Sequence, residues 1–373
     1  MKVKNLSILT GLDFGTDSLK VVVIRKGKTG LTLTGYANIS YGGAPLEDPV
    51  IVAGFIKKAL STVGSYARQV FVTLSTAAPL PLIRYQMLNN IPVEEMRAAL
   101  KVNSATYLNQ DYSDFYLDCA PLPVKEGQDP KASKISFLIA GAPKKDVDVI
   151  YKGLRAARLQ PLLLEVSGIS LINAYEYVKN NYFKSAAVML VDIGHSISSI
   201  SITNRGIPEL TRLLDFGGRK INETIASELS IAPVAAQQQK LHPSEQVDAI
   251  IRQSTVELTR EIKASMQFFE GQTGTEVGKV HLSGGTGRSE AVRTAITEDV
   301  GVACELWNPF ESMALNLKLK AANRYAKLLK TVMLRPVWRK VRASNSSSIV
   351  PNPPGNATRA FARSRKWNFR IAK

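Results

Sequence analysis

Two stretches of this chain, about half its length apart, repeat one pattern: an apolar strand, a short turn with an acid and a glycine, and a second apolar strand. The first is LTGLDFGTDSLKVVVI, from Leu9 to Ile24, and the second is AVMLVDIGHSISSISIT, from Ala187 to Thr203. Each predicts a β-hairpin, because two runs rich in β-branched residues flank a turn signal. A pair of such hairpins indicates a chain made of two related halves.

The segments that follow each hairpin extend the repeat and predict an α/β fold. A third strand is expected at 31–39 in the first half and at 209–215 in the second, so that each half begins with a three-stranded meander. Helical spacing of apolar residues follows at 48–66, and in the second half at 220–229 and 246–271. This mixture of strands and helices favours helices packed on sheets over a helical bundle.

The middle of the chain differs from both halves and predicts a small inserted subdomain. A helix at 92–108, an aromatic strand around 112–119 and an apolar strand at 136–141 are expected within it. A glutamine-rich run at 237–246 is expected to be a polar surface connection. The chain would then divide into a first lobe, the inserted subdomain, a second lobe with connecting helices, and a basic, disordered tail, at residues 1–84, 85–150, 151–320 and 321–373.

The composition is that of a soluble globular protein, with 45% hydrophobic and 21% charged residues in a chain of 373. No run of 18 or more apolar residues occurs, and the N-terminal MKVKNLSILTG does not resemble a signal peptide. We therefore expect a cytoplasmic protein. Cys119 and Cys304 are expected to be buried thiols, since two cysteines give neither a disulfide framework nor a metal site.

The net charge of +17 comes almost entirely from the end of the chain. No acid follows Glu311, whereas residues 318–373 contain 15 Lys and Arg; removing these from the 48 bases leaves 33 against 31 acids, about +2 for residues 1–311. The globular part thus gives no electrostatic reason to expect nucleic acid. Two interpretations of the tail stay open: a basic arm attracted to an anionic membrane or to nucleic acid, or a disordered extension without function.

The turn of each hairpin carries residue types that suit phosphate. Backbone N–H groups in a glycine turn can converge on an anion, because no side chain blocks its approach. A carboxylate just before the turn suits a divalent cation or the water bound to it. The two turns would grip phosphates from two sides, although a single turn of this kind more simply closes a hairpin. The residues concerned are Asp13, Gly15, Thr16 and Lys20 in the first turn, and Asp192, Gly194 and Ser196 in the second.

A third glycine-rich loop, LSGGTGRSEAV at Leu282–Val292, lies between a predicted strand and a predicted helix. Free N–H groups and the positive end of the helix dipole would face an anion or a purine–ribose unit there. The loop lacks the terminal Lys-Ser/Thr of a Walker A motif, and no βαβ unit with a downstream acid makes it a dinucleotide fingerprint.

In this order, the loops DFGT, DIGHS and SGGTG resemble the phosphate-1, phosphate-2 and adenosine motifs of the actin/hexokinase/heat-shock-chaperone ATPase superfamily. Within it, LTGLDFGTDSLKVVVI followed by LTLTGYANI resembles the opening of the PilM family, the actin-like proteins of type IV pilus assembly. VDIGHSISSISITNRGIPELTRLLDFGGRKINETIA and HLSGGTGRSEAVRTAITEDVGVACELWNPFE resemble its second half. The resemblance covers about residues 8–312.

The resemblance implies a duplicated actin-like, ribonuclease H-like fold, with ATP and Mg²⁺ in a cleft between two lobes. The seven turn residues named above would contact the phosphates, and Asp13 and Asp192 would hold Mg²⁺ partly through water. Glu165 would orient an attacking water, or, alternatively, cap the following helix at Ser167 or Ser170. The residues implied near the ribose and base are Gly217, Gly218, Lys220, Glu223, Gly284, Gly285 and Arg288.

The function that the resemblance implies is a scaffold, cytoplasmic and peripheral to the inner membrane, that docks the cytoplasmic N-terminal peptide of a PilN-type membrane protein according to nucleotide state. Other pilus assembly components and self-association are further expected contacts, and membrane contact would occur only through the partner or the basic tail. Any ATPase activity should be slow, because no confident general base is found. Two alternatives stay open: a small-molecule kinase of the same superfamily and a filament-forming division protein resembling FtsA.

Overall fold

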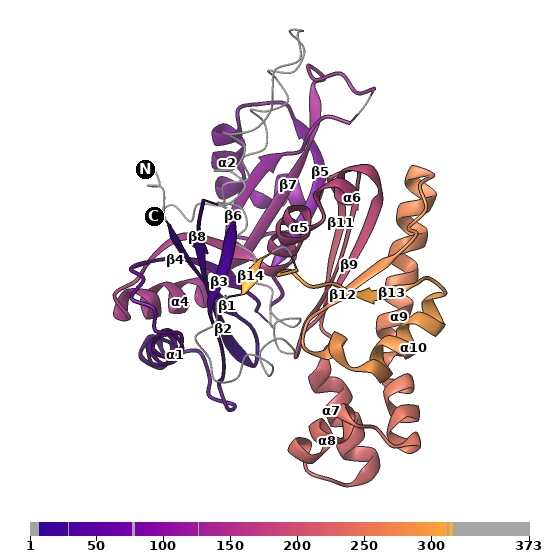
Figure 1. Ribbon diagram of the computed structural model, residues 1–373. Coiled ribbons are helices and arrows are strands. Elements are labelled where there is room, and N and C mark those ends of the chain that lie inside the picture. The colour runs from indigo at the N-terminus through magenta and orange to yellow at the C-terminus, as the bar shows by residue number, and fades with distance from the viewer. Residues whose placement is uncertain (1–6, 29, 77–78, 126, 312, 316–373) are drawn as a thin grey trace.

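A computed structural model describes residues 7–315, apart from 29, 77, 78, 126 and 312 (Figure 1). The tail predicted at 321–373 lies outside these described residues. Within them, none of the helices combines the length and the apolar character needed to cross a membrane. The described chain forms three sheets with helices packed against them, so the predicted α/β class is confirmed.

The first sheet is built around the first predicted hairpin. The two strands of this hairpin pair in antiparallel register, with Asp13 opposite Lys20. On the other side of the first strand, the strand that contains Thr73 runs parallel to it, with Thr73 beside Asp13. Valine, isoleucine and leucine fill both faces of these strands, as expected for a sheet covered on two sides. In spatial order its described strands are β14 (Ala314–Leu315), β3 (Leu31–Ser40), β2 (Ser18–Lys26), β1 (Ile8–Phe14), β4 (Gln69–Leu74) and β8 (Gln160–Val166).

The second sheet repeats the first. Its order β11-β10-β9-β12-β13 matches β3-β2-β1-β4-β8 strand for strand, with antiparallel pairs in the meander and parallel pairs beyond it. The predicted duplication is therefore confirmed. The strands are β9 (Ala187–Ile193), β10 (Ser198–Asn204), β11 (Ile207–Leu214), β12 (Val280–Ser283) and β13 (Cys304–Leu306).

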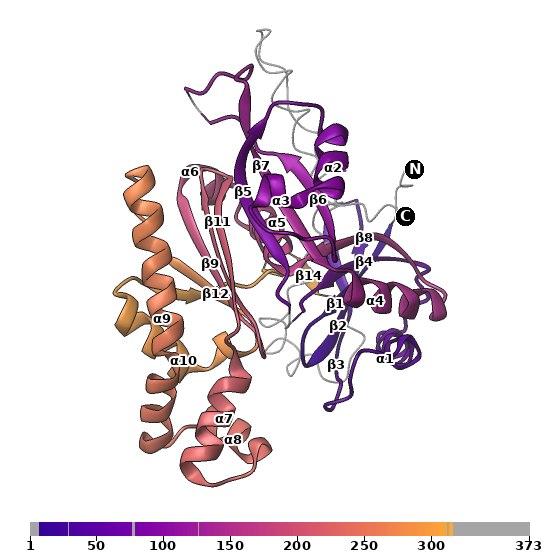
Figure 2. The same ribbon diagram turned by 180° about the vertical axis from the view of Figure 1, so that it is seen from behind.

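Helices cover the two sheets on their outer sides (Figures 1 and 2). On the first sheet, α1 (Pro49–Thr62) and α4 (Lys144–Ala156) pack against each other, and α1 begins where the Asp48 carboxylate accepts the Val50 N–H at 2.7 Å. On the second sheet the described helices are α7 (Gly218–Leu229), α8 (Pro233–Leu241), α9 (Glu245–Thr273), the 3₁₀ turn η1 (Thr286–Arg288) and α10 (Glu290–Val300).

The third sheet belongs to the middle of the chain and has the order β5-β7-β6. We propose that the inserted subdomain spans 82–143 in place of 85–150, because α4 packs on α1 and β8 joins the first sheet. Cys119 is buried within it, whereas Cys304 in β13 is only partly buried, and both are free thiols. Its elements are β5 (Leu82–Asn89), α2 (Val93–Val102), α3 (Ser104–Leu108), β6 (Phe115–Pro121) and β7 (Lys134–Pro143).

Two secondary-structure predictions are wrong. The single helix predicted at 92–108 is two helices, because Asn103 leaves the helical conformation and its side chain accepts the Thr106 N–H at 3.3 Å, starting a new helix. The first half of the connection predicted at 237–246 is occupied by α8. That helix starts with Pro233 in its first turn, and alanine and glutamine are favourable helix residues.

One apolar cluster lies between the two duplicated sheets. The helices α5 (Ser167–Val178) and α6 (Asn180–Ser185) carry the chain from the first sheet to the second, and β14 brings it back to pair with β3. Tyr175 of α5 packs edge to face on Trp307, with ring centroids 5.1 Å apart. The cluster therefore joins the lobes along both crossings of the chain.

Candidate functional site

The turn between β1 and β2 brings a carboxylate and an ammonium group together. Asp13, at the end of β1, is 8% exposed, and its Oδ2 lies 3.5 Å from Lys20 Nζ. A Cβ at Gly15 would lie 3.0 Å from that Nζ and 3.2 Å from the Ser18 carbonyl oxygen. Glycine at position 15 therefore lets the turn fold back on Lys20.

The turn between β9 and β10 has the same construction in the second lobe. Asp192 is half-buried, and its Oδ1 accepts the Ser283 hydroxyl at 2.9 Å. The Gly194 N–H donates to the Ile197 carbonyl at 3.0 Å, and a Cβ at position 194 would lie 2.6 Å from that oxygen. No larger residue fits this turn without moving its backbone.

The two turns meet across the lobes. The backbone N–H of Ser196 donates to the Thr16 hydroxyl at 3.2 Å, although the residues lie 180 positions apart in the sequence. The structure thus brings together the two halves of the predicted phosphate clamp.

A loop after β11 packs directly on the second turn. The Gly218 N–H donates to the Gly194 carbonyl at 3.0 Å, and the Arg219 N–H donates to the His195 carbonyl at 2.7 Å. A Cβ at Gly217 would overlap that same His195 carbonyl. Glycine is required here because two backbone segments touch.

The third predicted loop, between β12 and η1, closes the group. Gly284 has a φ of +88°, and a Cβ there would overlap the Ile193 backbone. The Thr286 hydroxyl donates to the Gly194 carbonyl at 2.9 Å, which ties this loop to the second turn. Gly285 is exposed, and burial lowers the pKa of the half-buried Arg288 guanidinium. Four glycine-dependent loops therefore converge at the junction of the lobes.

The family of this chain follows from comparison with known proteins. Residues 11–333 match the protein family described as type IV pilus assembly protein PilM. The chain belongs to the PilM family. Its fold is similar to that of a solved PilM-PilN type IV pilus biogenesis complex, with a TM-score of 0.76 and 24% identity over 89% of this chain and 98% of that one.

A second solved structure, the ethanolamine utilization protein EutJ from Carboxydothermus hydrogenoformans, is similar over 89% of each chain, with a TM-score of 0.51 and 11% identity. With the duplicated sheets, these likenesses confirm the actin-like fold predicted from the PilM resemblance.

Two residues that the PilM resemblance implies near the ribose are held by other partners. Lys220 Nζ donates to Glu257 of α9 at 2.5 Å, and Glu223 accepts Arg219 Nη1 at 2.9 Å. Both side chains lie on α7 and are about half exposed. Their contact with a ribose stays a prediction.

Glu165, the acid implied for orienting water, is 1% exposed at the end of β8. Its carboxylate accepts the Ser170 hydroxyl at 2.6 Å and the Asn173 side-chain amide at 3.3 Å, both from α5. The Ser170 hydroxyl also lies 3.3 Å from that of Thr73. The Ser170 contact is the one named in the capping alternative for Glu165, but it joins two side chains and caps no backbone N–H of α5, so both roles stay predictions.

Lys240 lies beside Gly218 and is not among the site residues predicted from the sequence. This lysine on α8 is 7% exposed, and its Nζ donates to the Gly218 carbonyl at 3.2 Å. Burial lowers its pKa to about 8. Lys240 therefore holds a removable proton next to the glycine loops. The helix-forming run after Pro233 could have indicated the helix that carries it, but not its contact with Gly218.

The acids of the two turns do not make a metal site by themselves. No group of three or more His, Cys, Asp or Glu side chains in the described part of the chain is arranged to hold a metal ion. Mg²⁺ commonly takes one or two carboxylates and completes its shell with phosphate oxygens and water, so a site at Asp13 and Asp192 that depends on bound nucleotide stays a prediction.

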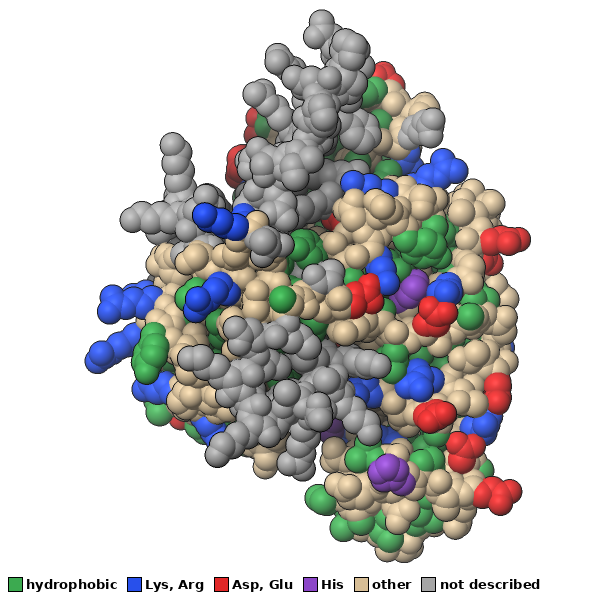
Figure 3. Space-filling view, viewed as in Figure 1, with side chains coloured by type: hydrophobic (Ala, Val, Ile, Leu, Met, Phe, Trp, Pro, Cys, Tyr) green, Lys and Arg blue, Asp and Glu red, His purple; other side chains and the backbone are tan. Residues whose placement is uncertain are grey.

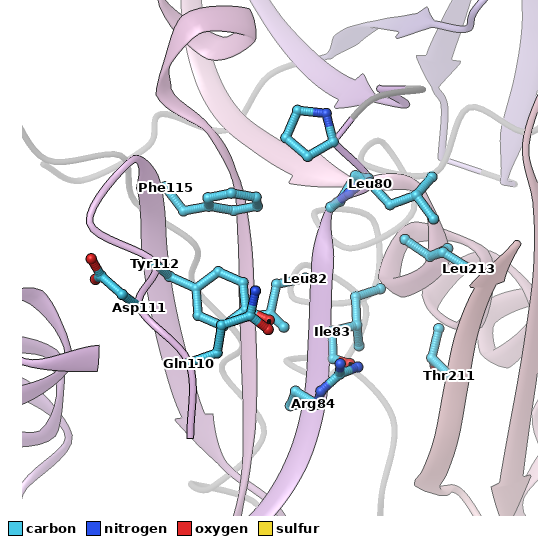
Figure 4. A pocket seen from close by; sticks show the side chains of 12 residues that line it. Leu80, Leu82, Ile83, Arg84, Gln110, Asp111, Tyr112, Phe115, Thr211 and Leu213 are labelled. Atoms are coloured by element: carbon cyan, nitrogen blue, oxygen red, sulfur yellow. Dashed lines mark hydrogen bonds between the residues drawn. The ribbon is translucent and has the colours of Figure 1, made fainter. Parts of the chain in front are cut away.

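A separate cavity of about 320 Å³ lies between the inserted subdomain and β11 (Figure 4). Leu82 and Ile83 of β5 form its floor, Tyr112 and Phe115 stand on one side, and Leu213 lies on the other. Tyr112 and Phe115 pack edge to face with centroids 5.2 Å apart. Arg84, Gln110 and Asp111 add polar groups, so the cavity combines apolar walls with hydrogen-bonding groups.

Proposed function

We propose that this chain is an actin-like, ATP-binding scaffold of type IV pilus assembly or a related secretion system. It docks the cytoplasmic N-terminal segment of a PilN-type inner-membrane protein, and nucleotide state changes that affinity. Membership of the PilM family supports the assembly role. The observation that carries the nucleotide role is the meeting of the two turns, at the Thr16–Ser196 hydrogen bond.

ATP suits the junction of the two turns, because its phosphates can accept hydrogen bonds from donors on both lobes. The turn after β1 would supply Thr16 and Lys20, and the turn after β9 would supply Ser196 and the close backbone approach that Gly194 allows. Mg²⁺ would lie near Asp13 and Asp192, partly through water, and offset the phosphate charge.

The base and ribose would lie toward the loop that carries Gly284, Gly285 and Arg288. A second cavity, of about 340 Å³, lies between the end of α8 and the start of α10, lined in part by Leu241, Ser289 and Ala291. Two of its lining residues, Leu241 and Ser289, directly follow Lys240 and Arg288 in the chain. This supports placing the nucleoside on this side.

Hydrolysis, where it occurs, should be slow. The buried Glu165 carboxylate is engaged by Ser170 and Asn173, and a general base must reach the water that it activates. A slow ATPase suits a protein in which nucleotide sets a docking state. Rapid sugar-dependent turnover would favour the kinase alternative.

The partner segment would occupy the cavity beside the inserted subdomain. Its apolar walls suit the side chains of an extended peptide, while Arg84, Gln110 and Asp111 suit polar groups. A similar fold has been solved as a PilM-PilN complex, which supports a PilN-type partner for this chain. Docking to such a partner would place the chain on the cytoplasmic side, peripheral to the inner membrane.

The test is a titration of the labelled N-terminal peptide of the cognate membrane partner into the full chain, with and without Mg-ATP. We expect the affinity to change with ATP, and Asp192→Asn to lose that change because the metal-facing carboxylate is gone. The matched control is Glu276→Gln, which neutralises an exposed acid. An equal peptide affinity of the wild-type chain with and without Mg-ATP would contradict the proposed dependence on nucleotide.

The docking position is tested by Tyr112→Ala, which removes one wall of the cavity. We expect at least tenfold weaker peptide binding with ATP binding intact, since buried aromatic anchors dominate such interfaces. Phe268→Ala on α9 removes a partly exposed aromatic ring elsewhere and should leave the peptide affinity unchanged. Equal peptide affinity in all three proteins would contradict this position.

A further inference from the structure

The globular part is nearly neutral as a whole, but its two halves carry net charges of opposite sign. Residues 1–166 contain 20 bases and 14 acids, a net +6, whereas residues 167–311 contain 13 bases and 17 acids, a net −4. Within the first part, the segments 18–46, 49–93 and 149–164 contain no Asp or Glu. These segments include β2, β3, β4, all of α1 and the second half of α4.

Six of the eleven bases in these segments lie on α1, on α4 or in the loops that follow these two helices. Helices α1 and α4 approach so closely that a Cβ at Gly153 would lie 3.2 Å from the Pro49 carbonyl, and the Gln160 N–H donates to the Arg68 carbonyl at 2.8 Å. These contacts join α1, the loop before β4 and the end of α4 into one surface. Its exposed bases, here called the basic face, are Lys57, Lys58, Arg68, Lys152, Arg155 and Arg158.

Figure 3 shows Lys and Arg side chains projecting from the left-hand edge of the molecule, where α1 and α4 lie in Figure 1. None of the six bases forms an ion pair with any residue that the structure describes. In the second lobe, Arg212, Lys220 and Arg252 each pair with an acid. The positive charge of the basic face is therefore available to an outside partner.

Two apolar side chains are exposed on the same part of the chain as the bases on α1 and before β4. Val50, in the first turn of α1, is 73% exposed, and Tyr66, two residues before Arg68, is 97% exposed. Exposed tyrosine and aliphatic groups beside Lys and Arg are typical of surfaces that lie at the lipid headgroup level. Binding to phosphate charge alone depends on Lys and Arg and does not require exposed apolar side chains.

We propose that the basic face binds the anionic lipid surface of a membrane. The six bases would lie against the headgroups, with Tyr66 and Val50 reaching toward the acyl boundary. This proposal goes beyond the docking of a membrane partner, because it gives the globular part a lipid contact of its own. It needs neither ATP nor the partner peptide. The 15 bases of residues 318–373 would add to the attraction from the same chain.

The test uses flotation of the full chain with vesicles of phosphatidylcholine, with or without phosphatidylglycerol. The face variant is Lys57→Gln/Lys58→Gln/Lys152→Gln, and the control variant with the same charge change is Lys101→Gln/Arg260→Gln/Lys263→Gln, on exposed sites of α2 and α9. Because each lysine near an anionic surface adds severalfold to affinity, we expect the face variant to bind anionic vesicles at least about tenfold more weakly. The wild-type chain and the control variant should bind them alike and should not bind phosphatidylcholine alone.

Three results would overturn the proposal. Equal vesicle binding by both variants would assign the lipid contact to the tail, and equal binding to neutral vesicles would exclude a charge-based contact. Tighter binding of the wild-type chain to duplex DNA than to anionic vesicles at the same salt, lost in the face variant, would identify nucleic acid as the ligand. The peptide titration described above reports on the partner site separately, so failure of one proposal is distinguishable from failure of the other.

Discussion

Ser196 and Thr16 belong to different lobes, yet the N–H of the first donates to the hydroxyl of the second at 3.2 Å. This bond joins the two turns that we propose as a phosphate clamp. Thr16→Val keeps the shape of the side chain but removes the acceptor, at a cost of about 1 kcal/mol. We expect nucleotide affinity to fall about fivefold, measured with a fluorescent ATP analogue. Thr16→Ser, which keeps the hydroxyl, should bind like the wild-type chain, and equal binding by the valine variant would contradict this role.

Gly284→Ala should destabilise the second lobe. The residue has a φ of +88° and its new Cβ would overlap the Ile193 backbone, so both conformation and contact oppose a side chain. We expect the free energy of unfolding in urea to fall by about 2 kcal/mol or more. Gly271→Ala is the matched control, because a Cβ there meets nothing within 4 Å and the site is helical. It should leave stability unchanged or raise it.

His281 should make the fold sensitive to acid. Burial lowers its pKa to about 4, and its Nε2 lies 2.9 Å from the Tyr175 hydroxyl. The unfolded chain therefore binds a proton from about pH 6.5 downward that the folded chain does not bind until about pH 4. Stability should fall as pH drops through this window, by at most about 3 kcal/mol. His281→Gln should show a smaller loss between pH 7 and pH 4.5, and an identical loss would rule out this histidine as the cause.

Lys240→Met should raise the free energy of unfolding at pH 7 while lowering nucleotide affinity. The lysine pKa is about 8 in the folded chain and 10.5 as the ordinary value, so folding disfavours the charged form by at most about 3 kcal/mol. That cost is fully present below pH 8 and disappears as pH rises toward 10.5. Since the variant also leaves the Gly218 carbonyl without this donor, we expect a net gain of about 1–2 kcal/mol at pH 7 that vanishes near pH 10. Nucleotide affinity should fall in the same variant.

Chemical unfolding at the two pH values measures the stability change of the methionine variant. Lys263→Met provides the control, because that lysine is exposed on α9 and its substitution should leave stability nearly constant at both values. A loss of stability at pH 7 on replacing Lys240 would show that its bond to Gly218 outweighs its burial.

Local signals in the sequence were sufficient for the hairpins and the three loops. Asp13, Asp192 and Gly284 lie in turns where close backbone contacts require glycine. Glycine at such positions is visible in the sequence as a turn signal. Lys240 could not be found this way, because its contact with the Gly218 carbonyl, 22 positions earlier in the chain, depends on how α8 packs against that loop. The basic face was hidden for a similar reason: a net charge summed over the chain averages two lobes of opposite sign.

The double crossing between the lobes has a mechanical consequence. Both crossings pass through the apolar cluster where Tyr175 packs on Trp307, so the lobes share a pivot rather than a single flexible tether. Rotation about this pivot displaces an element in proportion to its distance from it. A closing of the turns around Thr16 and Ser196 would therefore be accompanied by a displacement of the inserted sheet relative to β11, because β5 and β11 belong to the two parts that rotate and lie in contact.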